Sequence, residues 1–294
     1  MIERYLHELA AELSSVGIRG AQRRRILVEV EDHLRESGEP GRFGDPALIA
    51  ARFADELATS GARRLGFAVV AALAPAALVY AVLFSFSRPG PDITSARTLP
   101  VGIAAALAMV LAPQVALAAG LLSAARAWHT GTGSSAASIG VLRRRIAVAL
   151  GSGVVALAAI SVYAYEYGAG LPGWQQTFVF LAAGAAVVPV AAGSVALART
   201  SQLRPQAQGP AGDVFDDFAP VIDRFPLGLR GHPWRFCLLF AGAIAAVVLI
   251  VGGPDEGPRN AVLEFAAACA GFAAFGRYLG LRPSRARHCA SDSA

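Results

Sequence analysis

Two kinds of residue pattern divide the chain. Up to Arg64, apolar and polar positions alternate with a helical period, and after it long runs of Ala, Val, Leu and Gly dominate. In residues 2–15 and again in residues 21–37, apolar side chains recur at spacings of three and four, which places them on one helix face. The positions expected to be buried are Ile2, Tyr5, Leu6, Leu9, Leu13, Ile26, Leu27, Val30 and Leu34. The pattern predicts two short amphipathic helices.

A third amphipathic helix is expected to begin at Asp45-Pro46. The Asp45 carboxylate can accept a hydrogen bond from a free backbone N–H of the first turn, and proline fits the first helical position because its missing N–H has no partner there. We expect this helix to run to about Ser60. Its predicted inward positions are Leu48, Ile49, Phe53 and Leu57. We call residues 1–64, with their three predicted helices, the N-terminal module.

Six apolar segments follow the N-terminal module, each about 20 residues long. That length is sufficient for a helix to cross a hydrocarbon core of about 30 Å, and helices satisfy their own backbone polar groups there. The predicted spans are 65–86, 100–122, 146–167, 177–198, 234–252 and 261–280, with a tail at 281–294. The sequence therefore predicts an all-α protein with a three-helix cytoplasmic module followed by a six-helix transmembrane bundle.

The distribution of arginine predicts the orientation of this bundle. The chain has no lysine, and 55% of its residues are hydrophobic. With six spans both termini lie on one side, and that side carries 23 arginines against three on the other, Arg88, Arg97 and Arg259. Positive residues accumulate on the cytoplasmic side of membrane proteins. We expect a multi-pass protein of the inner (plasma) membrane with both termini cytoplasmic. Its net charge of +5 reflects topology, and direct nucleic-acid binding is not expected.

The densest polar cluster lies on the second predicted helix. Glu29 and His33 are four residues apart and share one helix face, so they are candidate metal ligands. The HExxH zinc-binding motif is missing from the sequence. A second histidine ligand would have to be His7 on the first helix. A solvated surface that binds a partner explains the cluster better. Hydrolase, nucleotide-binding and phosphate-binding motifs are also missing, so we expect no enzyme activity, catalytic residue, cofactor or metal.

Two acidic residues fall within predicted spans, where ionisable groups mark function by default. Glu166 and Glu264 both lie near the predicted outer ends of their spans, and we interpret them as boundary residues that reach interfacial water. Without a charge near the middle of a span, ion-coupled transport has little support.

The connection at 199–233 is the longest in the chain. Within it, residues 213–225 combine four aspartates with three phenylalanines, so attraction to anionic lipid is not expected. Our hypothesis is that this segment packs on the N-terminal module or on a partner.

Three motifs of the module together resemble a known family. They are Tyr5-Leu6-x-x-Leu9-x-x-x-Leu13, Ile26-x-x-Glu29-x-x-x-His33-Leu34 and Phe43-Gly44-Asp45-Pro46-x-x-Ile49-Ala50. This arrangement resembles the HAAS-type signalling domain and the related permease prefix domain. The resemblance covers about residues 1–60, and the Gly-Asp-Pro turn is its most specific part.

The resemblance implies a bacterial membrane protein. Proteins with this domain are often encoded beside PadR-like winged-helix transcription regulators, and others carry the domain ahead of the spans of export systems. The predicted outer connections, 87–99, 168–176 and 253–260, leave no room for the large extracellular domain of the permease group. The preferred function is therefore a signalling or regulatory protein whose module binds a cytoplasmic partner, a PadR-like regulator being the partner implied. The alternative is a permease-like or accessory subunit of an export system.

The expected partner-binding surface lies on the second helix of the module. Its residues are Arg25, Glu29, Asp32, His33 and Glu36. A change in the membrane bundle would reach this surface through residues 58–64, which lead into the first predicted span.

Overall fold

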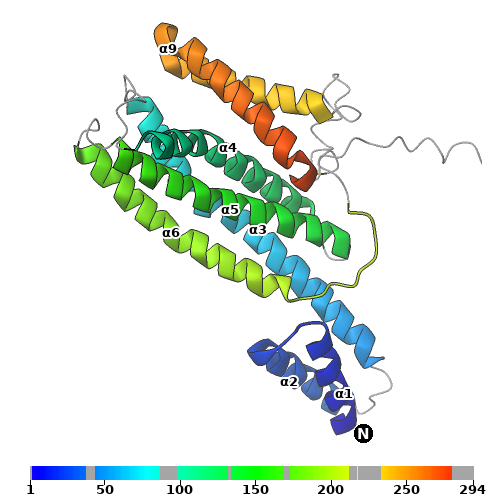
Figure 1. The fold of residues 1–294 in the computed structure, drawn as a ribbon. Helices are drawn as coiled ribbons and strands as arrows, with labels where there is room; N and C mark the ends of the chain where they lie inside the picture. Colours follow the sequence, from blue (N-terminus) through cyan, green and yellow to red (C-terminus); the bar gives the residue numbers. More distant parts are fainter. Residues whose placement is uncertain are drawn as a thin grey trace, which may run out of the picture.

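A computed structural model describes residues 2–37, 44–86, 98–131, 134–167, 173–211, 217 and 233–279. The described residues form an all-α structure. Long helices pack side by side in its upper part, and the two N-terminal helices lie together at its lower end (Figure 1).

The N-terminal module begins with the predicted helices α1 (Ile2–Ser15) and α2 (Gly20–Ser37). The central apolar side chains of both helices are buried, as their spacing predicts: Leu9, Leu13, Ile26, Val30 and Leu34. The outer positions of α1 and Leu27 of α2 are partly buried against the same core. The helical period of the sequence is therefore a correct guide to the module's core.

The third helix, α3 (Pro46–Phe86), begins where the sequence predicts. The Asp45 side chain accepts a hydrogen bond from the backbone N–H of Ala47 at 2.9 Å, so it caps the first turn. The Tyr5 hydroxyl of α1 donates to the Gly44 carbonyl at 3.2 Å. Burial, and then the nearby Asp45 carboxylate, raise the pKa of Tyr5, so its hydroxyl stays a donor at neutral pH.

The predicted end of the third helix at Ser60 is wrong. Helix α3 continues through Ser60-Gly61 without interruption, so the module and the first predicted span share one helix of 41 residues. Glycine weakens a helix interior but does not end it when neighbouring elements pack on both sides. Here a Cβ at Gly61 would lie 2.9 Å from Cγ2 of Thr200, which shows how closely α3 approaches the helix carrying that residue.

Alanines, not large side chains, form the most buried positions of the module part of α3. Ala50, Ala54, Ala58 and Ala62 recur every fourth residue and are fully buried. Leu48, predicted to point inward, is 62% exposed, which corrects that prediction. Ile49, Phe53 and Leu57 flank the alanine stripe and are partly buried against the core. Small residues let the neighbouring backbones come close, so the stripe sets a short packing distance.

Three described helices are long and apolar enough to cross a membrane. They are α4 (Leu99–His129), α5 (Ala136–Glu166) and, within α6 (Gly173–Ser201), residues Phe180–Ser201. They coincide with the second, third and fourth predicted spans. Many of their large apolar side chains are exposed, among them Leu107, Leu121, Val154, Leu181 and Val188. Soluble proteins rarely expose so much apolar surface, so these faces are suited to lipid.

The predicted connection at 123–145 is mostly helical. Helix α4 ends only at His129 and α5 begins already at Ala136, so Arg126 and Arg145 lie on helices. Both helices extend beyond their apolar runs toward the N-terminal module (Figure 1). Arg126 and Arg145 are therefore buried against other protein segments rather than lying in a loop.

The last helix, α9 (Pro233–Leu279), folds back on itself. In a straight helix Phe240 and Phe272 would lie about 48 Å apart at 1.5 Å per residue, yet their ring centroids are 5.5 Å apart. The helix bends sharply (Figure 1), and Pro254 and Pro258 lie between the two arms. Proline removes a helical hydrogen bond and bends the chain. The predicted connection at 253–260 is thus helical, and the two apolar segments that flank it run antiparallel.

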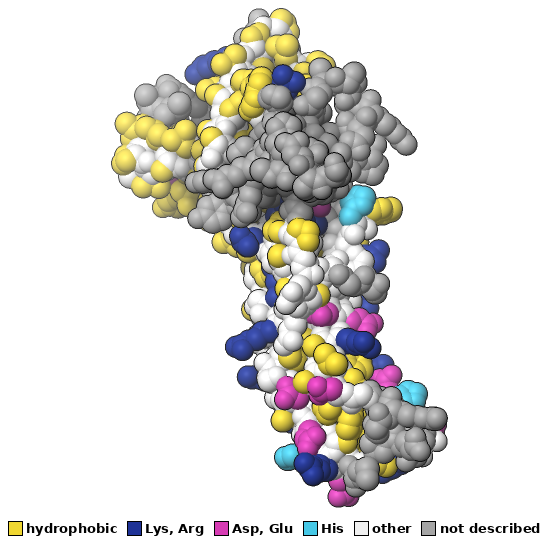
Figure 2. Space-filling model, turned by 90° about the vertical axis from the view of Figure 1, so that its right-hand side faces the viewer, with side chains coloured by type: hydrophobic (Ala, Val, Ile, Leu, Met, Phe, Trp, Pro, Cys, Tyr) yellow, Lys and Arg dark blue, Asp and Glu magenta, His cyan; other side chains and the backbone are white. Residues whose placement is uncertain are grey.

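The arrangement places α3 at the centre of the molecule. Helix α3 packs against α4, α5 and α6, α1 packs on its lower part, and α2 packs on α1. The arms of α9 pack on α4 and α5. Acidic side chains gather on the lower half of the face in Figure 2, over the module and the adjoining helix ends. Helix α2 is therefore the outermost element at the polar end.

The close approach of α3 and α4 gives a first prediction. A Cβ at Gly66 would lie 2.8 Å from Cβ of Ala127 and 3.1 Å from the Ser123 carbonyl oxygen, whereas a Cβ at Gly140 on α5 meets nothing within 4 Å. Gly66→Ala should destabilise the folded protein by about 1–3 kcal/mol because the two helices must separate. Gly140→Ala should be neutral or slightly stabilising, since alanine favours helix. Thermal unfolding of both variants in lipid nanodiscs measures the difference, and equal midpoints would contradict the packing described here.

Candidate functional site

A chain segment after α6 joins the N-terminal module to the membrane helices. We call residues 202–211 the strap. The strap backbone N–H of Arg204 donates to the Val16 carbonyl in the α1–α2 turn at 3.0 Å. The backbone N–H groups of Gln206 and Ala207 both donate to Oδ1 of Asp55 on α3, at 2.6 and 3.2 Å. One side of the strap is therefore bonded to the module.

The other side of the strap is bonded to the start of α5. The Ala136 backbone N–H donates to the Ala207 carbonyl at 2.8 Å. The Ser135 hydroxyl donates to the Pro210 carbonyl at 2.8 Å and also accepts from the Ser138 N–H, so it caps α5 while holding the strap. The Arg143 guanidinium of α5 donates to the Leu203 carbonyl at 3.1 Å. The strap thus bonds to the module and to a candidate membrane helix at once.

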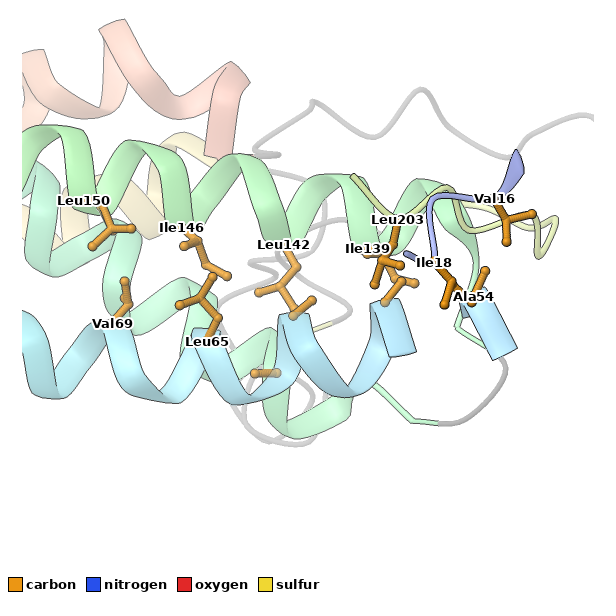
Figure 3. Close-up of a cluster of buried hydrophobic side chains, with 14 of the residues drawn as sticks. Val16, Ile18, Ala54, Leu65, Val69, Ile139, Leu142, Ile146, Leu150 and Leu203 are labelled. Carbon is orange, nitrogen blue, oxygen red and sulfur yellow. The ribbon is translucent and has the colours of Figure 1, made fainter. Parts of the chain in front are cut away.

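Apolar side chains make the same connection. Figure 3 shows a continuous row that begins at Val16 and Ile18 and passes Leu203 and Ile139. From there it continues between α3 and α5 through the residues Leu65, Leu142, Ile146, Val69 and Leu150. The module and the candidate membrane helices therefore share one hydrophobic core.

A buried ion cluster lies at the ends of α4 and α5. The Asp217 carboxylate, 5% exposed, accepts from Nη1 of Arg145 at 2.6 Å and from Nη1 of Arg126 at 3.2 and 3.3 Å. Arg145 is fully buried and also donates to the Leu122 carbonyl at 3.0 Å. Arg126 donates further to the Ser138 hydroxyl at 3.0 Å and to the Ala211 carbonyl, the last residue of the strap. The cluster therefore fixes the strap's C-terminal end to both helices.

The consecutive arginines 143–145 have different surroundings. Arg143 donates to the Thr200 and Leu203 carbonyls at the C-terminal end of α6, where a cation meets the negative end of the helix dipole. Arg144 is exposed, and Arg145 is buried with Asp217. A count of arginines on each side of the membrane treats all three residues alike. It cannot show that Arg145 is buried, because that burial depends on Asp217, which lies 72 residues later in the chain.

The predicted partner-binding residues all lie exposed on α2. Arg25, Glu29, Asp32 and Glu36 recur at spacings of three and four on one side of the helix, with His33 beside them, and we call these five residues the α2 stripe. The buried side chains Ile26, Val30 and Leu34 lie on the adjacent side of the helix, which packs on α1. His33 Nδ1 lies 3.9 Å from a carboxylate oxygen of Glu36. The structure thus brings the predicted residues together on one surface of the outermost helix.

The hypothesis that residues 213–225 pack on the module or on a partner stays a prediction. In the described part of the same connection, the strap contacts the module. Asp217 contacts α4 and α5, and the other residues of 213–225 lie outside the described part of the chain. No sequence pattern marks the strap, because the groups that it contributes to these hydrogen bonds belong to the backbone, whatever the side chain.

The two acidic residues predicted at span boundaries are both buried in the protein, which corrects the expectation that they reach water. Glu166 accepts a hydrogen bond from the Thr98 N–H at 2.6 Å, at the N-terminus of α4. A carboxylate there satisfies a free donor and meets the positive end of the helix dipole, so Glu166 has a structural role. Glu264, on the second arm of α9, is 3% exposed and lines a cavity between α3, α4 and α9.

The comparison with protein-family models assigns the N-terminal residues. Residues 4–52 match the HAAS family, which covers α1, α2 and the first two turns of α3. The matched region ends inside an uninterrupted helix, so this HAAS domain has no linker to the segment that follows. No curated protein and no solved structure matches the chain.

Two glycines with left-handed backbone test the strap contact. Gly17 and Gly20 have φ values of 90° and 63°, so alanine is strained at either position. A Cβ at Gly17 would also collide with the Gln202 carbonyl, whereas nothing lies within 4 Å at Gly20. Gly17→Ala should therefore cost about 1–3 kcal/mol more than Gly20→Ala. It should also accelerate hydrogen exchange at Arg204, Gln206 and Ala207. Equal exchange in the two variants would refute the contact.

The ion cluster gives a third prediction. Asp217→Asn removes the carboxylate charge that pairs with the buried guanidinium groups of Arg126 and Arg145, and removing one partner of a buried ion pair costs about 3–5 kcal/mol. The thermal midpoint should fall strongly, and hydrogen exchange should rise at the ends of α4 and α5. Glu56→Gln, which removes an exposed carboxylate of α3, is the matched control and should change little. A small effect for Asp217→Asn would mean that the cluster does not hold the strap.

Proposed function

We propose that this HAAS domain-containing membrane protein is a signalling or regulatory protein, in which the α2 stripe binds a cytoplasmic protein partner. The continuity between the module and the candidate membrane helices carries the proposal. A tethered binding domain needs only a flexible linker, whereas α3, the strap and the shared core join the two parts rigidly. Such a connection is suited to passing a change in the membrane helices to the module.

The proposed partner is a protein with a basic or mixed-charge surface. Three of the five residues in the α2 stripe are acidic, and all five are exposed. The resemblance of the module to HAAS-type domains supports a PadR-like transcription regulator as that partner. The arginine distribution favours a cytoplasmic module, on the side of the membrane where such a regulator is present. In this proposal all six apolar segments cross the membrane, and the chain carries out no catalytic step.

The mechanism requires two states of the junction that differ in how the stripe is presented. A partner shifts such an equilibrium only through different affinities for the two states. The strap is the element whose arrangement we expect to differ between them, because it contacts both the module and α5, and the Asp217 cluster holds its C-terminal end.

Reversing charge on the stripe tests partner binding. The full chain carrying Glu29→Arg and Glu36→Arg should lose at least about tenfold in affinity for a PadR-like regulator encoded beside its gene, since charge reversal at an interface costs more than about 1.4 kcal/mol. Glu56→Arg, on the exposed side of α3, is the control and should retain binding. Co-purification from detergent and titration in nanodiscs both measure the loss. Equal binding by all forms would refute the stripe as the partner site. Co-purification of an ATPase instead would favour the export-system alternative.

A further inference from the structure

A half-open polar pocket of about 540 Å³ lies where the α1–α2 turn meets the C-terminal end of α6. Its walls come from two distant parts of the chain, residues 14–19 and residues 201–204. Three serines, one glutamine and two arginines line it. Small-molecule sites usually measure about 300–1,000 Å³. The size therefore suits a small molecule, and the polar walls require one that is charged or rich in hydrogen-bonding groups.

Arg19 and Arg204 are the charged groups of this pocket. Both are exposed, and among the described residues neither guanidinium group pairs with a carboxylate. The Arg204 backbone N–H donates to the Val16 carbonyl at 3.0 Å, so the two segments that carry the arginines are bonded together. Val16, Ile18 and Leu203, which flank them in the chain, are buried in one cluster (Figure 3). The fold thus fixes two arginine-bearing segments side by side, and guanidinium groups bind phosphate oxygens well.

Two helices end at this pocket, and the negative end of a helix dipole repels an anion unless its carbonyls have partners. At the end of α1, the Ile18 N–H donates to the Leu13 carbonyl at 2.8 Å. At the end of α6, the Arg143 guanidinium donates to the Thr200 carbonyl. Other groups therefore satisfy these helix ends, and the two guanidinium groups of the pocket remain available to a ligand.

The three serines of the pocket can accept a ligand's hydrogen bond, but their own hydrogens are already used. Each hydroxyl donates its single hydrogen to a backbone carbonyl of its own helix, at 2.8 Å for Ser14 and 2.7 Å for Ser15 and Ser201. The Glu12 carboxylate, 3.4 Å from the Ser15 hydroxyl, is a further acceptor at this edge. A deprotonated phosphate has no hydrogen for these oxygens, whereas an alcohol does. The pocket therefore suits a ligand that carries both a phosphate and hydroxyl groups.

The position of the pocket along α6 indicates the source of such a ligand. Ser201 is the last residue of Phe180–Ser201, a 22-residue segment that is long and apolar enough to cross a membrane. At 1.5 Å per residue this segment is about 33 Å long, close to the hydrocarbon thickness of about 30 Å. A membrane crossed by α6 therefore has its lipid head groups beside Ser201. Basic pockets at the cytoplasmic ends of membrane helices bind anionic head groups in other proteins.

We propose that this pocket binds a phosphorylated polyol, either the head group of an anionic phospholipid such as phosphatidylglycerol or a soluble ester with the same groups. The phosphate bonds to Arg19 and Arg204, and the hydroxyl groups donate to Ser15 and Ser201. Because the pocket joins the α1–α2 turn to the start of the strap, the bound group stabilises the contact between the module and α6. The site does not depend on what the α2 stripe binds.

The lipid arm of the test compares two anionic lipids with identical acyl chains. Phosphatidylglycerol carries the hydroxylated head group, and phosphatidylmethanol carries the same phosphodiester charge without a hydroxyl. Native mass spectrometry of the full chain in detergent counts the bound lipids and measures the dissociation constant of each. One phosphatidylglycerol should bind saturably. Phosphatidylmethanol should bind about five- to tenfold more weakly, because it gives the serine oxygens no donor.

The soluble arm uses the full chain in phosphatidylcholine nanodiscs, titrated with glycerol phosphate in a calorimeter. Saturable binding here, with no bound phosphatidylglycerol in the lipid arm, would identify a soluble ester as the source. Binding of phosphatidylglycerol would identify the head group. Either result supports the shared chemistry of the proposed site.

Arginines near the same end of α6 supply the matched variants. Arg19→Gln and Arg204→Gln each remove one guanidinium group from the pocket and should weaken binding about tenfold. Arg199→Gln removes an exposed guanidinium group two residues before Ser201 that does not line the pocket, and affinity should stay within about twofold. Ser15→Ala should weaken phosphatidylglycerol binding about fivefold and leave phosphatidylmethanol binding unchanged.

Three outcomes would overturn the proposal. The first is that neither phosphatidylglycerol nor glycerol phosphate binds saturably. The second is an equal loss of affinity in Arg199→Gln and Arg19→Gln, which would show a general attraction of anions to a positive surface. The third is equal affinity of the unmodified chain for the two lipids, which would leave the serine oxygens without a role.

Discussion

One carboxylate and two guanidinium groups are buried in contact with one another, and each would be costly to bury alone. The need to keep them paired determines how the module and the candidate membrane helices are joined. Asp217 belongs to the connection between α6 and α9, whereas Arg126 and Arg145 belong to the facing ends of α4 and α5. All three side chains are at most 5% exposed, so separating the carboxylate from the guanidinium groups leaves charge in a medium that solvates it poorly. The ends of two candidate membrane helices and the connecting segment are therefore positioned as one unit.

The position of the strap follows from this cluster. Its C-terminal end, Ala211, is bonded to Arg126, and its start follows α6 directly, so the intervening residues must cross the module side of α3 and α5. There the strap contacts Asp55, and a single carboxylate oxygen of Asp55 accepts hydrogen bonds from two backbone N–H groups of the strap. The bond between module and membrane helices thus depends on chain segments that are more than 150 residues apart, together with an uninterrupted α3.

The local elements of this protein could be predicted from its sequence, and the long-range ones could not. Helical spacing locates α1, α2 and the start of α3, and it places all five residues of the α2 stripe on the exposed side. The same reasoning wrongly ends the third helix at Ser60. A serine-glycine pair weakens a helix, but elements that pack on α3 before and after this pair keep the helix continuous. The reasoning fails for Leu48 as well, since close packing selects the alanine stripe for burial instead.

The candidate sites show the same division. The pairing of Arg145 with Asp217 has no periodic signal, because their contact depends on how the connection after α6 returns to the bundle. The amide group of Gln114 on α4 is buried and has no hydrogen-bond partner among the described residues. Because this side chain is neutral and lies in an apolar run, a search for charged residues within spans passes over it. Glu166 and Glu264 look alike in sequence, yet one caps a helix and the other lines a cavity. Burial by distant segments makes these distinctions, and it becomes visible only in the fold.

The unbroken α3 also has a mechanical consequence. At 1.5 Å per residue its 41 residues form a rod about 60 Å long. If such a rod tilts by about 5° around its middle, each end moves by roughly 3 Å, which exceeds the shifts of about 1–2 Å that helices make at many allosteric interfaces. The helix is a lever arm: a small change of angle among the membrane helices becomes a larger displacement of the module, and a flexible linker at residues 58–64 would have absorbed it.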